Sequence, residues 1–197
     1  MNRFWTGCLC TAAAFAVGGA VVALGIVETG AYDTGATSPH MPITVWALHT
    51  TMLRSVARQS TKIAEPPITG AAVMAGARQY EQDCVACHGA PAVDRAIWVK
   101  GMNPTPPYLL DVTRQMSPAQ LYWVLSNGVK MTGMPAWGPS RSPEQLWNLV
   151  AFLEAQPYLP SRAYLRIRQA VAGKTGQGPG PGVLQDDWRV QPAGGGR

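Results

Sequence analysis

Residues 84–88 read Cys-Val-Ala-Cys-His, and the rest of the chain is organised around this stretch. C-x-x-C-H is the attachment signature of a c-type haem. Two thiols one helical turn apart can add to the two vinyl groups of one porphyrin, and a histidine directly after them can ligate the iron. The motif therefore predicts covalent bonds from Cys84 and Cys87 to one haem c, and an iron–nitrogen bond from His88.

Two other uses of C-x-x-C compete with this interpretation. A structural zinc site needs about four ligands, and the remaining cysteines, Cys8 and Cys10, lie in an apolar stretch. A thioredoxin-like redox pair does not need the histidine and accompanies a strand–helix–strand pattern, which is not found around the motif. Covalent haem is the interpretation that uses every residue of the motif.

A second motif follows at residues 128–137, Gly-Val-Lys-Met-Thr-Gly-Met-Pro-Ala-Trp. An electron-transfer haem needs a sixth iron ligand, and a methionine thioether raises the potential of cytochrome c iron. Met134 is the predicted ligand, because it lies in a loop marked by glycine and stiffened by Pro135. Met131 is the competing candidate. In a third interpretation both methionines only fill gaps in the core.

Together these features resemble the class I cytochromes c. The resemblance covers about residues 70–157 and is carried by Gly76, Tyr80, the C-x-x-C-H motif with Gly89, the Met134-Pro135-Ala136 loop and a final aromatic-rich helix. The domain looks most like that of single-haem, membrane-anchored cytochromes of bacterial respiratory chains, and is similar to the cytochrome subunit of cbb3-type oxidases. The resemblance implies an all-α haem domain, His88 and Met134 as axial ligands, and one-electron transfer. The single C-x-x-C-H implies one haem.

The N-terminal segment contains no charge from residue 4 to residue 27. A helix of this length, at about 1.5 Å per residue, spans a hydrocarbon core of roughly 30 Å. Arg3 precedes the run and Glu28 follows it, so the positive-inside rule places the N-terminus in the cytoplasm. A cleaved secretory signal is the rival interpretation, but its apolar region is usually about 7–15 residues long. We therefore expect a single-pass anchor in a bacterial inner membrane, with the haem domain in the periplasm.

Residues 42–59 have the pattern of an amphipathic helix, with Pro42 in its first turn. Its apolar stripe is expected to contain Ile43, Trp46, Leu53 and Ala57. Two roles remain open for this helix: it covers its own haem domain, or it lies on the bilayer surface or on an integral-membrane partner. The nearby histidines, His40 and His49, are expected to be polar surface groups and not haem ligands.

Three helices are expected inside the haem domain. The first, residues 71–83, carries the haem motif, and Gly76 lets another helix approach it closely. The other two begin at residues 117–120 and 142–145, where Ser-Pro-x-Gln places a serine N-cap before proline and glutamine and so predicts a capping box. Between them, Lys130 and Arg141 are either a rim for docking a partner or solvated surface charges.

The loop from residue 89 to residue 111 is rich in proline. A metal-bound histidine usually donates its other ring N–H to a carbonyl or a carboxylate. In class I cytochromes a proline carbonyl of this loop accepts that bond, so the resemblance offers Pro104, Pro106 and Pro107 as candidates. Trp98 and Tyr108 are expected to lean on the porphyrin or to close its edge.

These features divide the chain into four parts: a transmembrane anchor (1–28), a juxtamembrane helix with its linker (29–69), the haem domain (70–157) and a basic, Gly/Pro-rich C-terminal tail (158–197) that includes a short basic helix at 162–172. The formal net charge is +5, but residues 65–157 carry −1 and residues 158–197 carry +4. Nucleic-acid binding is excluded, because it needs a basic patch with aromatics on a folded face.

The sequence thus predicts a membrane-anchored monohaem cytochrome c that carries single electrons in a bacterial respiratory chain and is not itself an enzyme. Its expected partners are the lipid bilayer and redox proteins, namely a membrane dehydrogenase or a terminal oxidase. It acts as a free carrier or as a subunit of a multisubunit complex. The alternative is a haem enzyme or gas-binding sensor with an exchangeable sixth iron ligand.

Overall fold

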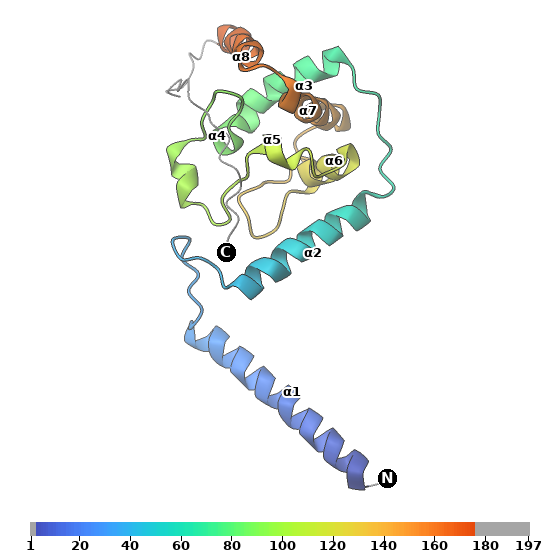
Figure 1. The fold of residues 1–197 in the computed structure, drawn as a ribbon, viewed down its shortest axis with the longest axis vertical. Coiled ribbons are helices and arrows are strands. Elements are labelled where there is room, and N and C mark those ends of the chain that lie inside the picture. Colours follow the sequence, from blue (N-terminus) through green and yellow to red (C-terminus); the bar gives the residue numbers. More distant parts are fainter. Residues whose placement is uncertain (1–2, 176–197) are drawn as a thin grey trace. The chain divides into compact units, whose positions relative to one another are not determined.

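The structure, a computed structural model, describes residues 3–175, and the chain divides after Pro39 into two units that are treated separately below. Within residues 3–175 the regular elements are helices and no strand forms, which confirms the all-α prediction. Figure 1 labels the α-helices. In chain order the elements are α1 (Arg3–Thr29), α2 (Pro42–Ser60), α3 (Gly70–Asp83), α4 (Val85–His88), the 3-10 helix η1 (Ile97–Gly101), α5 (Leu109–Val112), α6 (Pro118–Asn127), α7 (Pro143–Ala155), the 3-10 helix η2 (Gln156–Tyr158) and α8 (Ser161–Thr175).

The first unit holds α1, which forms where the uncharged run predicts a helix. It has 27 residues and a mean hydropathy of 2.2 over its most apolar window, so it is long and apolar enough to cross a membrane. None of its described side chains is buried. The helix ends before Gly30, whose φ of +63° is a conformation that favours glycine and stops a helix.

The second unit is built on the crossing of α3 and α7 (Figure 1). At Gly76 a Cβ atom would lie 1.8 Å from the backbone oxygen of Asn148 and 2.9 Å from Cβ of Phe152. Only glycine lets the two backbones come this close, so the predicted close approach at Gly76 is confirmed. Around the crossing lies one core cluster: Ala77, Tyr80, Cys84, Val93, Leu121, Leu125, Leu146, Leu149, Val150, Phe152, Leu153 and Tyr164.

Both predicted capping boxes are present. The hydroxyl of Ser117 accepts from the backbone N–H of Gln120, and the Gln120 side chain accepts from the Ser117 N–H. Ser142 and Gln145 repeat the arrangement at the start of α7. Each box satisfies two N–H groups that a helix start otherwise leaves unpaired, so the starts of α6 and α7 are well defined, and with them the loop between the two helices.

Helix α2 packs on α6 through its C-terminal half. Its buried residues are Val56 and Ser60, whereas Ile43, Trp46 and Leu53 of the predicted apolar stripe are exposed. The predicted apolar stripe is therefore not the face that packs on the haem domain; Val56 and Ser60 lie beside it on the helix surface. Its other open role, contact with a bilayer surface or a partner, remains a prediction. Both buried residues lie in the C-terminal half of α2, and the more apolar first half is left exposed.

Helix α8 packs on α3, although its residues fall in the segment that the sequence analysis assigned to a tail. Tyr164 is fully buried and donates its hydroxyl proton to Glu81 of α3. Arg168 adds an ion pair to the same carboxylate, with its Nε 3.3 Å from Oε2 of Glu81. The predicted basic helix at 162–172 is present, and at least as far as Val171 it is part of the folded unit. The predicted Gly/Pro-rich remainder, beyond residue 175, lies outside the described residues.

Candidate haem site

The C-x-x-C-H motif lies where α3 passes into the short helix α4. Cys84 is the C-cap of α3 and donates its N–H to the carbonyl oxygen of Tyr80 at 2.9 Å, while its own carbonyl accepts from the N–H of His88 at 2.9 Å. The buried Tyr80 hydroxyl donates to the carbonyl oxygen of Gly89 at 2.6 Å. Gly89 has a φ of +66°, which favours glycine. The motif is therefore held at both ends, by the helix before it and by the turn after it.

His88 is oriented by the proline-rich loop that follows it. Its Nδ1 lies 2.8 Å from the carbonyl oxygen of Pro107, so Pro107 is the acceptor among the three prolines considered. A proton on Nδ1 makes this bond and leaves the lone pair of Nε2 available to a metal. Burial lowers the pKa of His88, which favours the neutral imidazole, the form that binds metals.

The two cysteines differ in their surroundings. Cys84 is buried and Cys87 is half-buried. Burial raises the pKa of the Cys84 thiol to about 12, whereas cysteines of reactive redox pairs have lowered pKa values. Within residues 3–175, no three His, Cys, Asp or Glu side chains are grouped so that they could hold a metal ion. The described residues thus offer no further ligands beside the motif for a structural zinc site.

The loop between α6 and α7 holds the backbone of Met134 by a small network. The hydroxyl of Thr132 accepts from the N–H of Met134 at 3.0 Å and donates to the carbonyl of Val129 at 2.8 Å. The N–H of Val129 donates to the carbonyl of Met134 at 3.2 Å. At Gly128, where φ is +64°, a Cβ atom would lie 2.7 Å from the same carbonyl oxygen. The loop is thus closed tightly on either side of Met134.

The two candidate methionines lie in different environments. Met134 is partly buried and packs against the core cluster that contains Cys84. Met131 is 82% exposed and has a φ of +60°. Met134, and not Met131, therefore packs against the core of the domain, which favours Met134 as the candidate ligand. His49 is exposed on α2.

The residues present fit a haem. A neutral imidazole and a methionine thioether are the axial ligands of cytochromes c. Trp137, at the end of the loop, packs against the core cluster, and its buried Nε1 has no hydrogen-bond partner within the described residues. A buried donor of this kind costs free energy unless a polar group meets it, and a porphyrin carries carboxylate groups. Trp98, expected at the haem edge, is 56% exposed.

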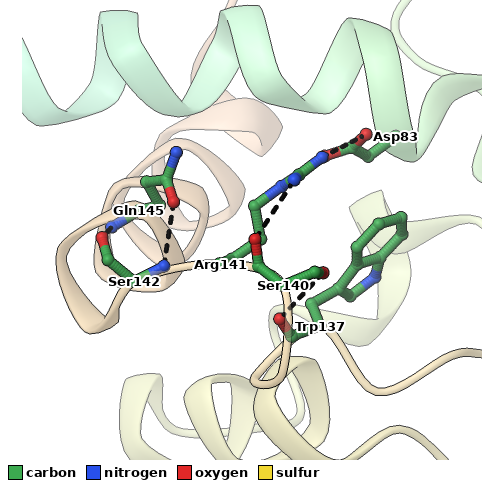
Figure 2. A network of polar contacts seen from close by, with 6 residues as sticks. All are labelled: Asp83, Trp137, Ser140, Arg141, Ser142 and Gln145. Atoms are coloured by element: carbon green, nitrogen blue, oxygen red, sulfur yellow. Dashed lines mark hydrogen bonds and ion pairs between the residues drawn. The ribbon is translucent and has the colours of Figure 1, made fainter.

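Arg141 is half-buried and forms an ion pair with Asp83. Figure 2 shows its side chain reaching Asp83, the last residue of α3, with its Nη2 2.9 Å from Oδ2 and 3.0 Å from Oδ1. The side chain of Asp83 is 12% exposed and that of Arg141 is 28% exposed. The sequence did not predict this ion pair, because its two partners lie 58 residues apart along the chain. Lys130 is exposed.

Sequence reasoning also missed Arg95. Its guanidinium carbon lies 4.0 Å from the centroid of the Tyr108 ring, and its Nη1 donates to the carbonyl oxygen of Pro106. These contacts flank Pro107 on both sides and therefore steady the carbonyl that accepts from His88. No local pattern marks Arg95, because its contacts depend on the path that the loop takes back to it.

The fold and the site define a class. An all-helical domain in which α3 and α7 cross at a glycine, with C-x-x-C-H after α3 and a methionine loop before α7, is a domain of the cytochrome c type. Comparison with known protein families agrees: residues 71–153 match the family described as cytochrome C oxidase, cbb3-type, subunit III. This match shows a cytochrome c-like haem domain in that part of the chain. No curated protein matches the chain.

Proposed function

We propose that this chain is a membrane-anchored monohaem cytochrome c that carries single electrons in a bacterial respiratory chain, as a free carrier or as a subunit of a dehydrogenase or oxidase complex. The observation that carries the proposal is the bond from His88 Nδ1 to the carbonyl of Pro107, made by the histidine of a C-x-x-C-H motif inside a cytochrome c-like domain. It leaves one imidazole nitrogen free for iron.

Each site residue has a stated role in this proposal. Cys84 and Cys87 would bond covalently to one haem, and His88 and Met134 would be the ligands of its iron. Bound haem supplies one-electron exchange at its iron. The protein holds His88 through Pro107 and Met134 through Thr132. With haem bound, rigid placement of both side chains would limit the access of water to the iron and so help to set its potential.

The decisive experiment compares two methionine variants of the full chain, made in a host that matures c-type cytochromes. The protein should be heavier by one haem per chain, and its oxidised spectrum should show the methionine-to-iron charge-transfer band. Met134→Ala should lose this band and bind carbon monoxide when reduced. Met131→Ala is the matched control and should keep the wild-type behaviour. A colourless protein, or one without the added mass, would refute covalent haem, and carbon monoxide binding by the wild type would favour an enzyme or sensor.

We also propose that α1 is an uncleaved anchor in the inner membrane and that the haem domain lies in the periplasm. The length and hydropathy of α1 support the anchor, and Arg3 ahead of the apolar run supports a cytoplasmic N-terminus. The purified protein should then begin at or near Met1 and should resist alkaline extraction from membranes. An N-terminus after residue 28 would show that the segment is a signal.

A further inference from the structure

The end of the Met134 loop is fastened to α6 through backbone hydrogen bonds. The N–H of Trp137 donates to the carbonyl of Leu125 at 2.9 Å, and the N–H of Gly138 donates to that of Ser126 at 3.0 Å. The N–H of Arg141 then donates to the carbonyl of Trp137 at 2.9 Å. Residues 137–141 therefore form one fixed turn. Because this turn follows Met134 closely, holding the Arg141 side chain in place also holds the end of the Met134 loop.

The side chain of Arg141 joins this turn to α3 (Figure 2). Besides its two bonds from Nη2, it donates from Nε to Oδ2 of Asp83 at 3.2 Å. A forked, charge-assisted pair of this kind is stronger than a neutral hydrogen bond and is specific in its geometry. Asp83 directly precedes Cys84, so the pair connects the loop of one proposed axial ligand with the segment that holds the other.

Trp137 completes the connection. The guanidinium carbon of Arg141 lies 5.5 Å from the centroid of its ring, which is within the range of a cation–π contact. Trp137 and Met134 both pack against the core cluster that contains Cys84. Asp83, Arg141 and Trp137 therefore form a continuous bridge from the cysteine motif to the methionine loop.

We infer that Arg141 is a positioning residue that keeps the Met134 loop closed, so that the methionine sulfur is not replaced by other iron ligands. The inference rests on the proposed function. A foreign ligand reaches the iron only when the loop opens, so its apparent affinity equals its intrinsic affinity multiplied by the open fraction. Weakening the bridge raises that fraction without changing any bond at the iron.

The test is a titration of the oxidised, full-length holoprotein with imidazole, followed by absorption. Arg141→Gln and Asp83→Asn should each raise the apparent affinity for imidazole about tenfold, because each removes a charged hydrogen-bond pair. Arg141→Lys keeps the charge but loses the fork, and it should give a smaller rise. The double variant should bind no more tightly than either single variant, because the two residues act through one interaction.

Arg168→Gln is the matched control. It removes a second ion pair on the same helix α3, that of Arg168 with Glu81 at 3.3 Å, but this pair fastens α8 and not the loop. It should lower the thermal midpoint and leave imidazole affinity unchanged. An equal rise in Arg168→Gln, or no rise in Arg141→Gln and Arg141→Lys, would overturn the inference. If Arg141→Gln does not fold, Arg141→Lys decides the question.

The outcomes separate this inference from the function on which it rests. If the wild type binds imidazole as readily as Met134→Ala does, Met134 is not the ligand and the proposed site fails. If the wild type resists imidazole and the Arg141 variants resist it equally, only the role of Arg141 fails.

Discussion

Replacing Gly76 by alanine tests the helix crossing on which the domain is built. The new methyl carbon would lie 1.8 Å from the backbone oxygen of Asn148, whereas ordinary contacts are about 3.5 Å. Because the clashing atom is backbone, α7 must move away by roughly 1.5 Å. Overpacking of this kind lowers the free energy of unfolding by about 1–3 kcal/mol. We expect the upper end of this range, because the backbone of α7 is a rigid neighbour. Alanine has a higher helix propensity than glycine, which offsets about 0.5–1 kcal/mol of this loss. The net loss in the free energy of unfolding is therefore about 2 kcal/mol.

The assay is urea unfolding of the detergent-solubilised chain, followed by tryptophan fluorescence and far-UV circular dichroism. With a slope of about 2 kcal/mol per molar urea, the midpoint should fall by about 1 M. Gly70→Ala is the control, since Gly70 begins the same helix and a methyl group added there would meet nothing within 4 Å. An unchanged midpoint in Gly76→Ala, or an equal loss in Gly70→Ala, would refute the reasoning.

Two further predictions concern buried polar groups. Tyr164→Phe should lower the free energy of unfolding by about 1.5–3 kcal/mol, because it removes a hydrogen bond to the charged, buried Glu81; Tyr158→Phe, at an 81% exposed residue, should change nothing, and thermal unfolding compares the two. Glu154→Gln should stabilise the protein at neutral pH. Burial, followed by the charge of Glu65, raises the pKa of Glu154, so the unfolded chain releases this proton first and stability falls as pH rises through the raised pKa. Urea midpoints measured across this pH range should fall in the wild type and stay level in Glu154→Gln. If the midpoints of both proteins fall in parallel, the prediction is refuted.

The parts of the fold that the sequence predicts well are those set by residues close together in the chain. Ser117 with Gln120 and Ser142 with Gln145 form their capping boxes within one helical turn. Cys84, Cys87 and His88 form one motif because they are close together in the chain. The apolar run of α1 predicts its helix by its length alone. At Gly76 the sequence predicted a close approach, but a lone glycine in a helix does not say which helix approaches it.

The parts that escaped prediction depend on contacts between distant residues. From the sequence, Arg141 looks like a surface charge, because its partner Asp83 lies 58 residues away in the chain. Tyr164 was assigned to the tail, because its partner Glu81 lies 83 residues earlier in the chain. The residues that α2 buries, Val56 and Ser60, were not predicted. Hydrophobic periodicity shows which residues could face an apolar partner and does not show where along the helix a neighbour lies.

The packing of α8 on α3 has a practical consequence for shortened versions of this protein. The family match ends at residue 153, and the predicted domain ends at residue 157. A chain shortened to either residue would lack Tyr164 and Arg168, the two partners of the Glu81 carboxylate, whose side chain is 8% exposed. It would also uncover the face of α3 that Tyr164 covers. A soluble fragment prepared for spectroscopy should therefore extend past Val171.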